Sequence, residues 1–179
     1  MHKEKFLAID LFSGAGGLTA GLKSAGFKVI AGVEINKTAA KSYKLNHRKH
    51  RMYEQDIRTL NPKDILTELG LKSGELDLLA GCPPCQGFST LRTRNKRVSV
   101  EDIRNELIFE FLRFVEEMQP KTVMMENVPG LVKDTRMASF LDGLRKLGYI
   151  VDEHVLAVKD VSDYGVPQRR RRMILLASK

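Results

Sequence analysis

Short apolar runs alternate with amphipathic stretches along this chain. Short apolar runs bounded by polar residues and glycine are typical of buried strands, whereas apolar residues three and four positions apart indicate helices. The pattern predicts strands at 6–12, 29–34, 52–55, 76–80, 122–126, 150–158 and 173–177. It predicts helices at 18–25, 37–45, 62–69, 104–118 and 140–147, the clearest being 104–118 with Leu107, Ile108, Phe111, Leu112 and Val115 on one face.

This alternation predicts the fold class. Strands that alternate with helices favour an α/β fold, with a mostly parallel sheet and helices on both faces. Residues 81–100 show little apolar periodicity and are predicted to form a long loop. Loops of that length are uncommon and often functional. We therefore expect one α/β domain over residues 1–179, with a functional loop in its middle.

Composition narrows the class of protein. Of 179 residues, 42% are hydrophobic and 29% are charged, which excludes disordered and collagen-like chains. The longest uncharged stretch, 78–91, contains two prolines and is shorter than a membrane helix. The N-terminal residues do not resemble a signal peptide. Two cysteines three positions apart exclude a disulfide framework and predict a reducing compartment. We expect a cytoplasmic protein without a membrane partner.

The charge points to a polyanionic partner. Thirty Lys and Arg residues against 22 Asp and Glu residues give a net charge of +8. Much of the excess lies in three runs, 41–51, 92–97 and 169–172. A single basic run is usually a solvated face. Three runs in one small domain favour nucleic acid, because lysine and arginine neutralise phosphates.

The first chemical signal is the segment Asp-Leu-Phe-Ser-Gly-Ala-Gly-Gly at 10–17, at a predicted strand-to-helix turn. Glycines there let a ligand approach the backbone beside the positive end of a helix. The spacing differs from the dinucleotide motif, because Thr19 occupies the place of the third glycine. Glu34 and Asp56 end the next two predicted strands, where a carboxylate can accept hydrogen bonds from ribose. The alternative for the glycines is a tight turn without a ligand.

The second signal is Gly-Cys-Pro-Pro-Cys-Gln-Gly-Phe-Ser at 81–89. Two prolines stiffen the approach to Cys85, and a positioned thiol is a competent nucleophile. A Cys-x-x-Cys pair can also be a redox centre, or two buried structural residues. A zinc site would need two further ligands, so no metal is expected. The residues alone leave the first three alternatives open.

Two further signals follow. Glu126 begins the segment Glu-Asn-Val-Pro-Gly at a predicted strand end, either placed to act on a ligand or simply exposed at the start of a loop. Gln168 precedes four arginines, 169–172, before the last strand. On an extended segment Gln168, Arg170 and Arg172 point to one side. The alternative is a basic cap on the strand, but four consecutive arginines are costly without an anionic or carbonyl partner.

Together these segments, in this order, resemble the C5-type DNA cytosine methyltransferases. The matching elements are 10–17, Glu34, Asp56, 83–86, 126–128 and Gln168-x-Arg170-x-Arg172. The resemblance implies a Rossmann-like methyltransferase fold, S-adenosylmethionine as cofactor without a metal, and double-stranded DNA as substrate. It also implies the bacterial cytoplasm or nucleoid and, for many small relatives, a restriction–modification system.

The resemblance also implies catalytic roles. Cys85 corresponds to the nucleophile that adds to C6 of cytosine, whereas Cys82 falls on a variable, structural position. Glu126 corresponds to the residue that stabilises N3. Arg170 and Arg172 correspond to the arginines that help hold the base and the nucleophile's loop. The target base leaves the stack, as it must for chemistry on a base.

The cofactor site is implied in the same way. The residues that match cofactor contacts surround adenine, ribose and the methionine part: Phe12, Gly14, Gly17, Glu34, Ile35, Asp56, Ile57, Pro84 and Leu107.

One departure concerns DNA recognition. The family continues beyond the last matched strand with a target-recognition region, a further motif and a helix that completes the cofactor pocket. We therefore expect a catalytic domain without its target-recognition domain, either completed by a second polypeptide or truncated. A non-catalytic binding module, a transfer RNA cytosine methyltransferase and a redox protein that uses Cys82 and Cys85 are the alternatives.

Overall fold

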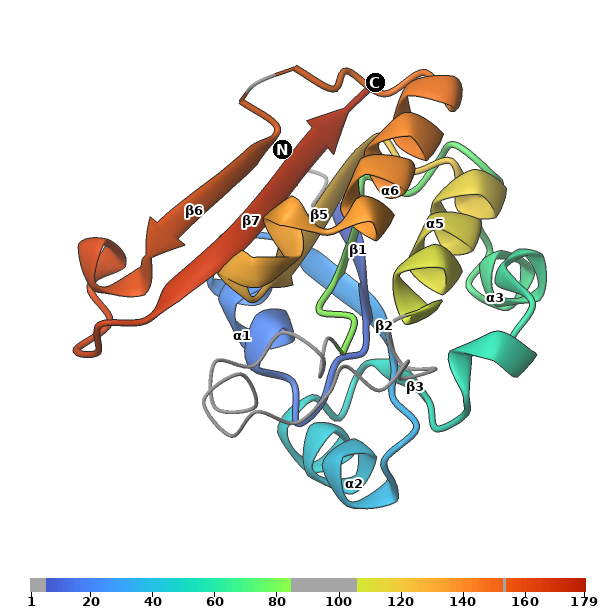
Figure 1. Ribbon diagram of the computed structural model, residues 1–179. Helices are drawn as coiled ribbons and strands as arrows, with labels where there is room; N and C mark the ends of the chain where they lie inside the picture. The colour runs from blue at the N-terminus through green and yellow to red at the C-terminus, as the bar shows by residue number, and fades with distance from the viewer. Residues whose placement is uncertain (1–5, 85–105, 153) are drawn as a thin grey trace, which may run out of the picture.

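The computed structural model describes residues 6–84, 106–152 and 154–179. A seven-stranded sheet forms its centre, in the order β3-β2-β1-β4-β5-β7-β6 (Figure 1). Strands β1 to β5 run parallel, and β7 is antiparallel to both β5 and β6. The strands are β1 Leu7–Leu11, β2 Lys28–Val33, β3 Arg51–Tyr53, β4 Leu78–Gly81, β5 Thr122–Asn127, β6 Leu156–Asp160 and β7 Arg171–Ser178.

The helices begin at capping residues that the sequence supplies. The side chains of Asn36, Asn61 and Asp134 accept hydrogen bonds from the first turns of α2, α3 and α6. Pro62 suits the first turn of α3, where its missing N–H costs nothing. The α-helices are α1 Gly17–Ser24, α2 Lys37–Asn46, α3 Pro62–Glu68, α5 Leu107–Met118 and α6 Thr135–Lys146, and the 3-10 helices are η1 Ile57–Thr59, η4 Pro129–Lys133 and η5 Val161–Tyr164.

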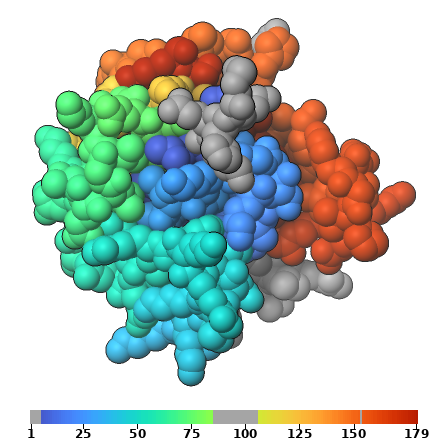
Figure 2. All heavy atoms as spheres, turned by 180° about the vertical axis from the view of Figure 1, so that it is seen from behind, coloured from blue at the N-terminus to red at the C-terminus, as the bar shows by residue number. Residues whose placement is uncertain are grey.

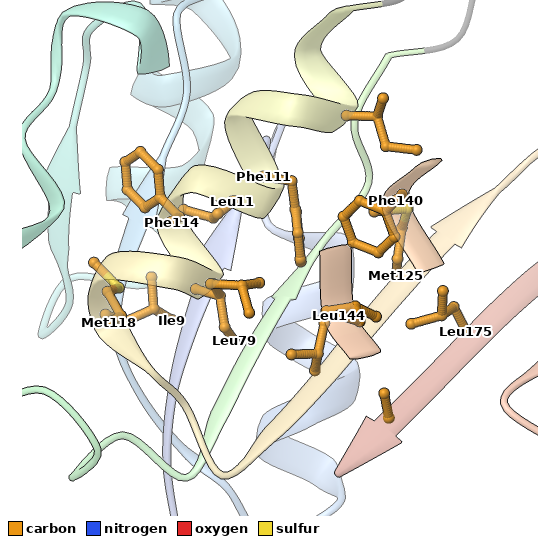
Figure 3. Close-up of a cluster of buried hydrophobic side chains, with 14 of the residues drawn as sticks. Ile9, Leu11, Leu79, Phe111, Phe114, Met118, Met125, Phe140, Leu144 and Leu175 are labelled. Atoms are coloured by element: carbon orange, nitrogen blue, oxygen red, sulfur yellow. The ribbon is translucent and has the colours of Figure 1, made fainter. Parts of the chain in front are cut away.

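The main core lies between the sheet and helices α3, α5 and α6. Strand residues point alternately to the two faces, so Leu79 packs against the α5 side and Leu78 against the α1 side. Figure 3 shows the larger cluster, in which Phe111 of α5 and Phe140 of α6 face the sheet. Their rings lie 6.0 Å apart, edge to face. Leu22 of α1 covers Ala8 and Leu78 on the opposite face.

The last two strands extend away from this core. Seen from behind in Figure 2, the orange-red atoms of η5 and the adjoining strand ends project to one side of the blue and cyan first half of the chain. Among the described helices, none combines the length and the apolar character that would let it cross a bilayer.

The predicted α/β class and mostly parallel sheet are confirmed. The strand predicted at 150–158 is wrong over 151–152 and 154–155, because Asp152 accepts a hydrogen bond from the N–H of His154 at 2.8 Å and turns the chain. The helix predicted at 140–147 begins earlier, at the Asp134 cap. The third strand ends at Tyr53, so Asp56 does not end it but caps η1. Residues 85–100 of the predicted loop lie outside the described residues.

Candidate active site

A cleft of about 450 Å³ opens where β1, β2, β3 and β4 end. Ligands of parallel α/β sheets bind at the carboxyl ends of the strands, and this volume suits a small molecule. Four segments and the first turn of α5 line the cleft. Its residues are Phe12, Val33, Glu34, Ile35, Gln55, Asp56, Ile57, Arg58, Cys82, Pro84 and Leu107.

The glycine turn between β1 and α1 has an unusual backbone. Phe12, Gly14 and Gly16 have φ angles of 57°, 55° and 95°, in the left-handed region. At Gly16 a Cβ atom would lie 2.3 Å from Nε2 of His47, so no side chain fits there. The Ser13 N–H donates to the Val33 carbonyl at 3.0 Å, which ties the turn to the end of β2.

Glu34 links the glycine turn to the start of α2. Its Oε2 accepts a hydrogen bond from the Gly14 N–H at 2.9 Å, and its Oε1 accepts one from the Asn36 N–H at 2.7 Å. Each carboxylate oxygen has a second acceptor position. Glu34 is therefore held in the cleft wall and can still accept hydrogen bonds from a ligand's hydroxyl groups.

Asp56 is held as an ionised acceptor. It caps η1 and pairs with Arg58 at 2.5 Å. The hydrogen bond from the Arg58 side chain holds the pKa of Asp56 below its usual range, although burial opposes it. Nearby, Ile35 is 61% exposed. An apolar side chain left open beside two carboxylates suits a ligand with both a flat apolar part and hydroxyl groups.

The second part of the site lies at the end of β5. Arg172 Nε lies 2.7 Å from Glu126 Oε1, and only 16% of the Arg172 side chain is exposed. Glu126 faces Ile174 across the antiparallel pair, so Arg172, two residues before Ile174, reaches back on the same face. This pairing depends on the antiparallel β7, which sequence periodicity did not predict.

Asn127 and Cys82 connect the two parts. Asn127 Nδ2 donates to the Pro83 carbonyl at 2.8 Å, which holds the segment before Cys85 against β5. The Cys82 thiol hydrogen-bonds Glu126, and burial, followed by the charges of Glu126 and Asp10, raises the pKa of that thiol. Cys82 therefore stays protonated at neutral pH and is a poor nucleophile.

The structure brings seven of the predicted cofactor residues into one cleft: Phe12, Glu34, Ile35, Asp56, Ile57, Pro84 and Leu107. Gly14 supports Glu34, and Gly17 begins α1. Arg172 meets Glu126, whereas Arg170 is exposed and its N–H donates to Asp160. Cys85 and the basic run at 92–97 lie outside the described residues. The sequence analysis did not assign Val33, Gln55, Arg58 or Asn127, which adjoin or lie near a predicted residue, and it gave Cys82 only a structural position although this residue lines the cleft.

Comparison with known proteins agrees with this geometry. A family model described as C-5 cytosine-specific DNA methylase matches residues 6–179. The chain is 39% identical to the Type II methyltransferase M.AgeI of Thalassovita gelatinovora, over 95% of this chain and 39% of that protein. It is 35% identical to the Type II methyltransferase M.AquIA of a Picosynechococcus species, over 96% of this chain and 71% of that protein.

A solved structure of a putative DNA modification methyltransferase encoded within an Escherichia coli prophage superposes with a TM-score of 0.80 and 32% identity. The match covers 98% of this chain and 47% of that one. The chain thus spans less than half the length of several relatives that it matches. With a family model that covers almost all of its residues, the chain belongs to the C-5 cytosine-specific DNA methylase family.

Proposed function

We propose that this chain carries the catalytic site of an enzyme that transfers a methyl group from S-adenosylmethionine to C5 of cytosine in double-stranded DNA. The observation that carries the proposal is the Glu126–Arg172 pair, joined through Asn127 to the Pro83–Pro84 segment that leads into Cys85. The cleft beside it supports a bound cofactor. The names of the relatives, Type II methyltransferases, support a restriction–modification system.

The cleft residues suit S-adenosylmethionine. Glu34 and Asp56 are acceptors for ribose hydroxyls and the adenine edge, and Phe12, Ile35 and Leu107 supply apolar surface for the adenine ring. When bound, S-adenosylmethionine supplies an electrophilic methyl group on its sulfonium. Among residues 6–84, 106–152 and 154–179, no three carboxylate, imidazole or thiol side chains lie together in a group that could hold a metal ion.

The proposed chemistry divides between two side chains. The Cys85 thiolate adds to C6 of the cytosine ring, which makes C5 nucleophilic, and Glu126 acts at N3 to stabilise the added electrons. Arg172 and the Cys82 thiol hold the Glu126 carboxylate in place. After C5 has received the methyl group, loss of the C5 proton re-forms the C5–C6 double bond and expels Cys85 as the thiolate. Cys85 is assigned from its motif, because it lies outside the described residues.

The activity is proposed for the whole enzyme rather than for these residues alone, because the matched relatives extend far beyond the matched part. We propose that target recognition comes from outside residues 1–179, from a second polypeptide or from a further part of the same protein. A DNA substrate and a content of only two cysteines support a cytoplasmic location.

The test is tritiated methyl transfer to duplex DNA and to transfer RNA, by the chain alone and with the polypeptide that supplies recognition. Glu126→Gln should lower kcat by about 10²–10⁴-fold, the usual range for an acid–base group. The exposed Glu116→Gln is the matched control. Methylation of transfer RNA but not of DNA would contradict the proposed substrate.

Covalent trapping on 5-fluorocytosine DNA tests the nucleophile. Wild type and Cys82→Ser should form the adduct, and Cys85→Ser should not. An adduct with Cys85→Ser would disprove the assignment of the nucleophile, whatever the methyl acceptor is.

A further inference from the structure

A line of hydrogen-bonding side chains runs beneath the glycine turn, from Asp10 at the end of β1 to His50 after α2. The Thr19 hydroxyl lies 2.6 Å from Asp10 Oδ2 and 3.1 Å from the Tyr43 hydroxyl. The Tyr43 hydroxyl lies 3.3 Å from His50 Nδ1. Asp10, Thr19 and Tyr43 are fully buried, and His50 is partly exposed. The line therefore connects a buried carboxyl group with solvent.

If all three contacts are hydrogen bonds and the Asp10 proton is on Oδ2, hydrogen counting leaves two arrangements of this line. Each hydroxyl has one hydrogen to donate. When Asp10 is ionised, Thr19 donates to Asp10, Tyr43 donates to Thr19, and His50 Nδ1–H donates to Tyr43. When Asp10 is protonated it donates to Thr19, and every later bond reverses, so that Tyr43 donates to His50 Nδ1. The protonation state at one end thus sets the state at the other.

The surroundings shift the pKa values of the groups at both ends of the line. Burial raises the pKa of Asp10 to about 7, and the nearby charge of Glu34 adds to this, against the hydrogen bonds from Thr19. Cys82 faces the same carboxyl group from the end of β4. Burial, together with the charges of His47 and Lys23, lowers the pKa of His50. His50 is therefore mostly neutral and able to pass on a proton.

Asp10 is also close to the cleft, and one of its carboxyl oxygens lacks a hydrogen-bond partner among the described residues. Its Oδ1 is buried and has no hydrogen-bond partner among the described residues. Its neighbours Glu34 and Cys82 both line the cleft, and Phe12 follows it by two residues. A cation bound in the cleft would favour the ionised form of Asp10 through Coulomb attraction, which is strong in a poorly solvated site.

We propose that Thr19, Tyr43 and His50 form a proton path that carries the Asp10 proton to solvent when a cationic ligand binds in the cleft. The Asp10 proton passes to Thr19, the Thr19 proton to Tyr43 and the Tyr43 proton to His50 Nδ1, while the His50 Nε2 proton leaves to water. One proton leaves the protein. Each hydroxyl on the path gains one proton and loses one, and the hydrogen bonds along the line reverse direction. The inference rests on the proposed function, because the cation is the sulfonium-bearing cofactor.

The first test needs no ligand. In carbon-13 NMR of the free protein, the Asp10 carboxyl carbon should titrate with a midpoint near pH 7, and the His50 ring signals should show an inflection at the same pH. In Tyr43→Phe the shared inflection should disappear, because the path is broken. Tyr53→Phe, which removes a tyrosine hydroxyl bonded to Glu68, is the matched control and should keep it. An Asp10 carboxyl that stays ionised from pH 5 to 9, or a shared inflection retained in Tyr43→Phe, would overturn the proposal.

The second test measures protons on binding. Calorimetry of S-adenosylmethionine binding at pH 7 in phosphate and in Tris should show release of about half a proton per site, because Asp10 is then half protonated. Asp10→Asn should release none, and S-adenosylhomocysteine, which lacks the sulfonium charge, should release less. In stopped flow with a pH indicator, Tyr43→Phe should release its proton at least ~10-fold more slowly than wild type or Tyr53→Phe.

The two failures are distinguishable. If S-adenosylmethionine does not bind, the proposed function fails, and the NMR titration of the free protein still decides on the proton path. If S-adenosylmethionine binds without releasing a proton, or Tyr43→Phe releases it as fast as wild type, the proton path fails and the proposed function stands.

Discussion

The two ends of the sheet are built differently. At the β1–β2 end, polar side chains are buried beneath the glycine turn, and Asp10, Thr19 and His47 lie almost wholly out of solvent. At the β7–β6 end, buried groups such as Leu175 are apolar, and Leu176 on the opposite face is 57% exposed. We infer that the stability of the first end depends on buried charge and pH, whereas the core of the second end depends mainly on side-chain volume.

The open face of the second end carries an apolar hollow of about 670 Å³. Met124, Ile174 and Leu176 form part of its floor, and Lys159 and Arg172 lie among its other lining residues. The alternation along β7 explains it, because Met173, Leu175 and Ala177 face the helices while the residues between them face outward.

The largest expected effect separates the two faces of β7. Leu175→Ala should lower the free energy of unfolding by about 3–5 kcal/mol, because it empties a fully buried position. Leu176→Ala, on the exposed face of the same strand, should cost less than about 1 kcal/mol. Urea denaturation of both variants measures the contrast. Equal losses would mean that the outer face is covered in the protein in solution.

The next effect tests the charge at the first end. The folded-state pKa of Asp10 is raised from 3.8 to about 7, so the folded protein holds a proton that the unfolded chain has lost. The wild type therefore loses stability as pH rises from about 4 to about 7, and the loss is complete above that. Asp10→Asn should avoid this loss in the free energy of unfolding, which amounts to about 4 kcal/mol at most.

Denaturant melts at pH 5 and pH 8 check this prediction. The free energy of unfolding of Asp10→Asn should rise relative to that of the wild type between pH 5 and pH 8. The same pH dependence in both proteins would place the titrating group elsewhere.

A smaller effect concerns packing beneath the turn. Gly16 and Gly26 have nearly the same φ, 95° and 94°, but a Cβ atom at Gly26 meets nothing within 4 Å. Gly16→Ala should cost about 3 kcal/mol, since backbone strain adds to the contact with His47. Gly26→Ala should cost only the strain, about 1 kcal/mol. Thermal unfolding distinguishes them, and equal costs would argue against His47 as the barrier.

The smallest effect on stability is expected at the Glu126–Arg172 pair, which joins β5 and β7. Arg172→Gln removes the partner of Glu126 and should cost about 1 kcal/mol, because the pair is only partly buried. Arg171→Gln, at an exposed position at the start of the same strand, should lower the free energy of unfolding by only a few tenths of a kcal/mol. In the methyl-transfer assay the difference between the two variants should be larger, and the activity of Arg172→Gln should be far below that of Arg171→Gln. Equal activities would remove Arg172 from the site.

Local patterns predicted most of the elements well. The apolar spacing predicted helices at 104–118 and 62–69, and the structure has α5 over Leu107–Met118 and α3 over Pro62–Glu68. The strand at 150–158 was predicted in part wrongly, because a side-chain hydrogen bond at Asp152 outweighs the apolar pattern there. Periodicity also could not show that β7 runs antiparallel, since strand direction depends on pairing with distant residues.

For the site, the sequence by itself determined which residue types are present and, through their order, the family. The motif residues Glu34, Asp56 and Glu126 all follow short apolar runs, and parallel strands bring such positions to one edge. Only the tertiary structure decided the partners. Arg172 rather than Arg170 reaches Glu126, Asn127 holds Pro83, and His47 fills the space that Gly16 leaves. These contacts join residues far apart in the chain, so they depend on strand register and helix packing, which no local pattern specifies.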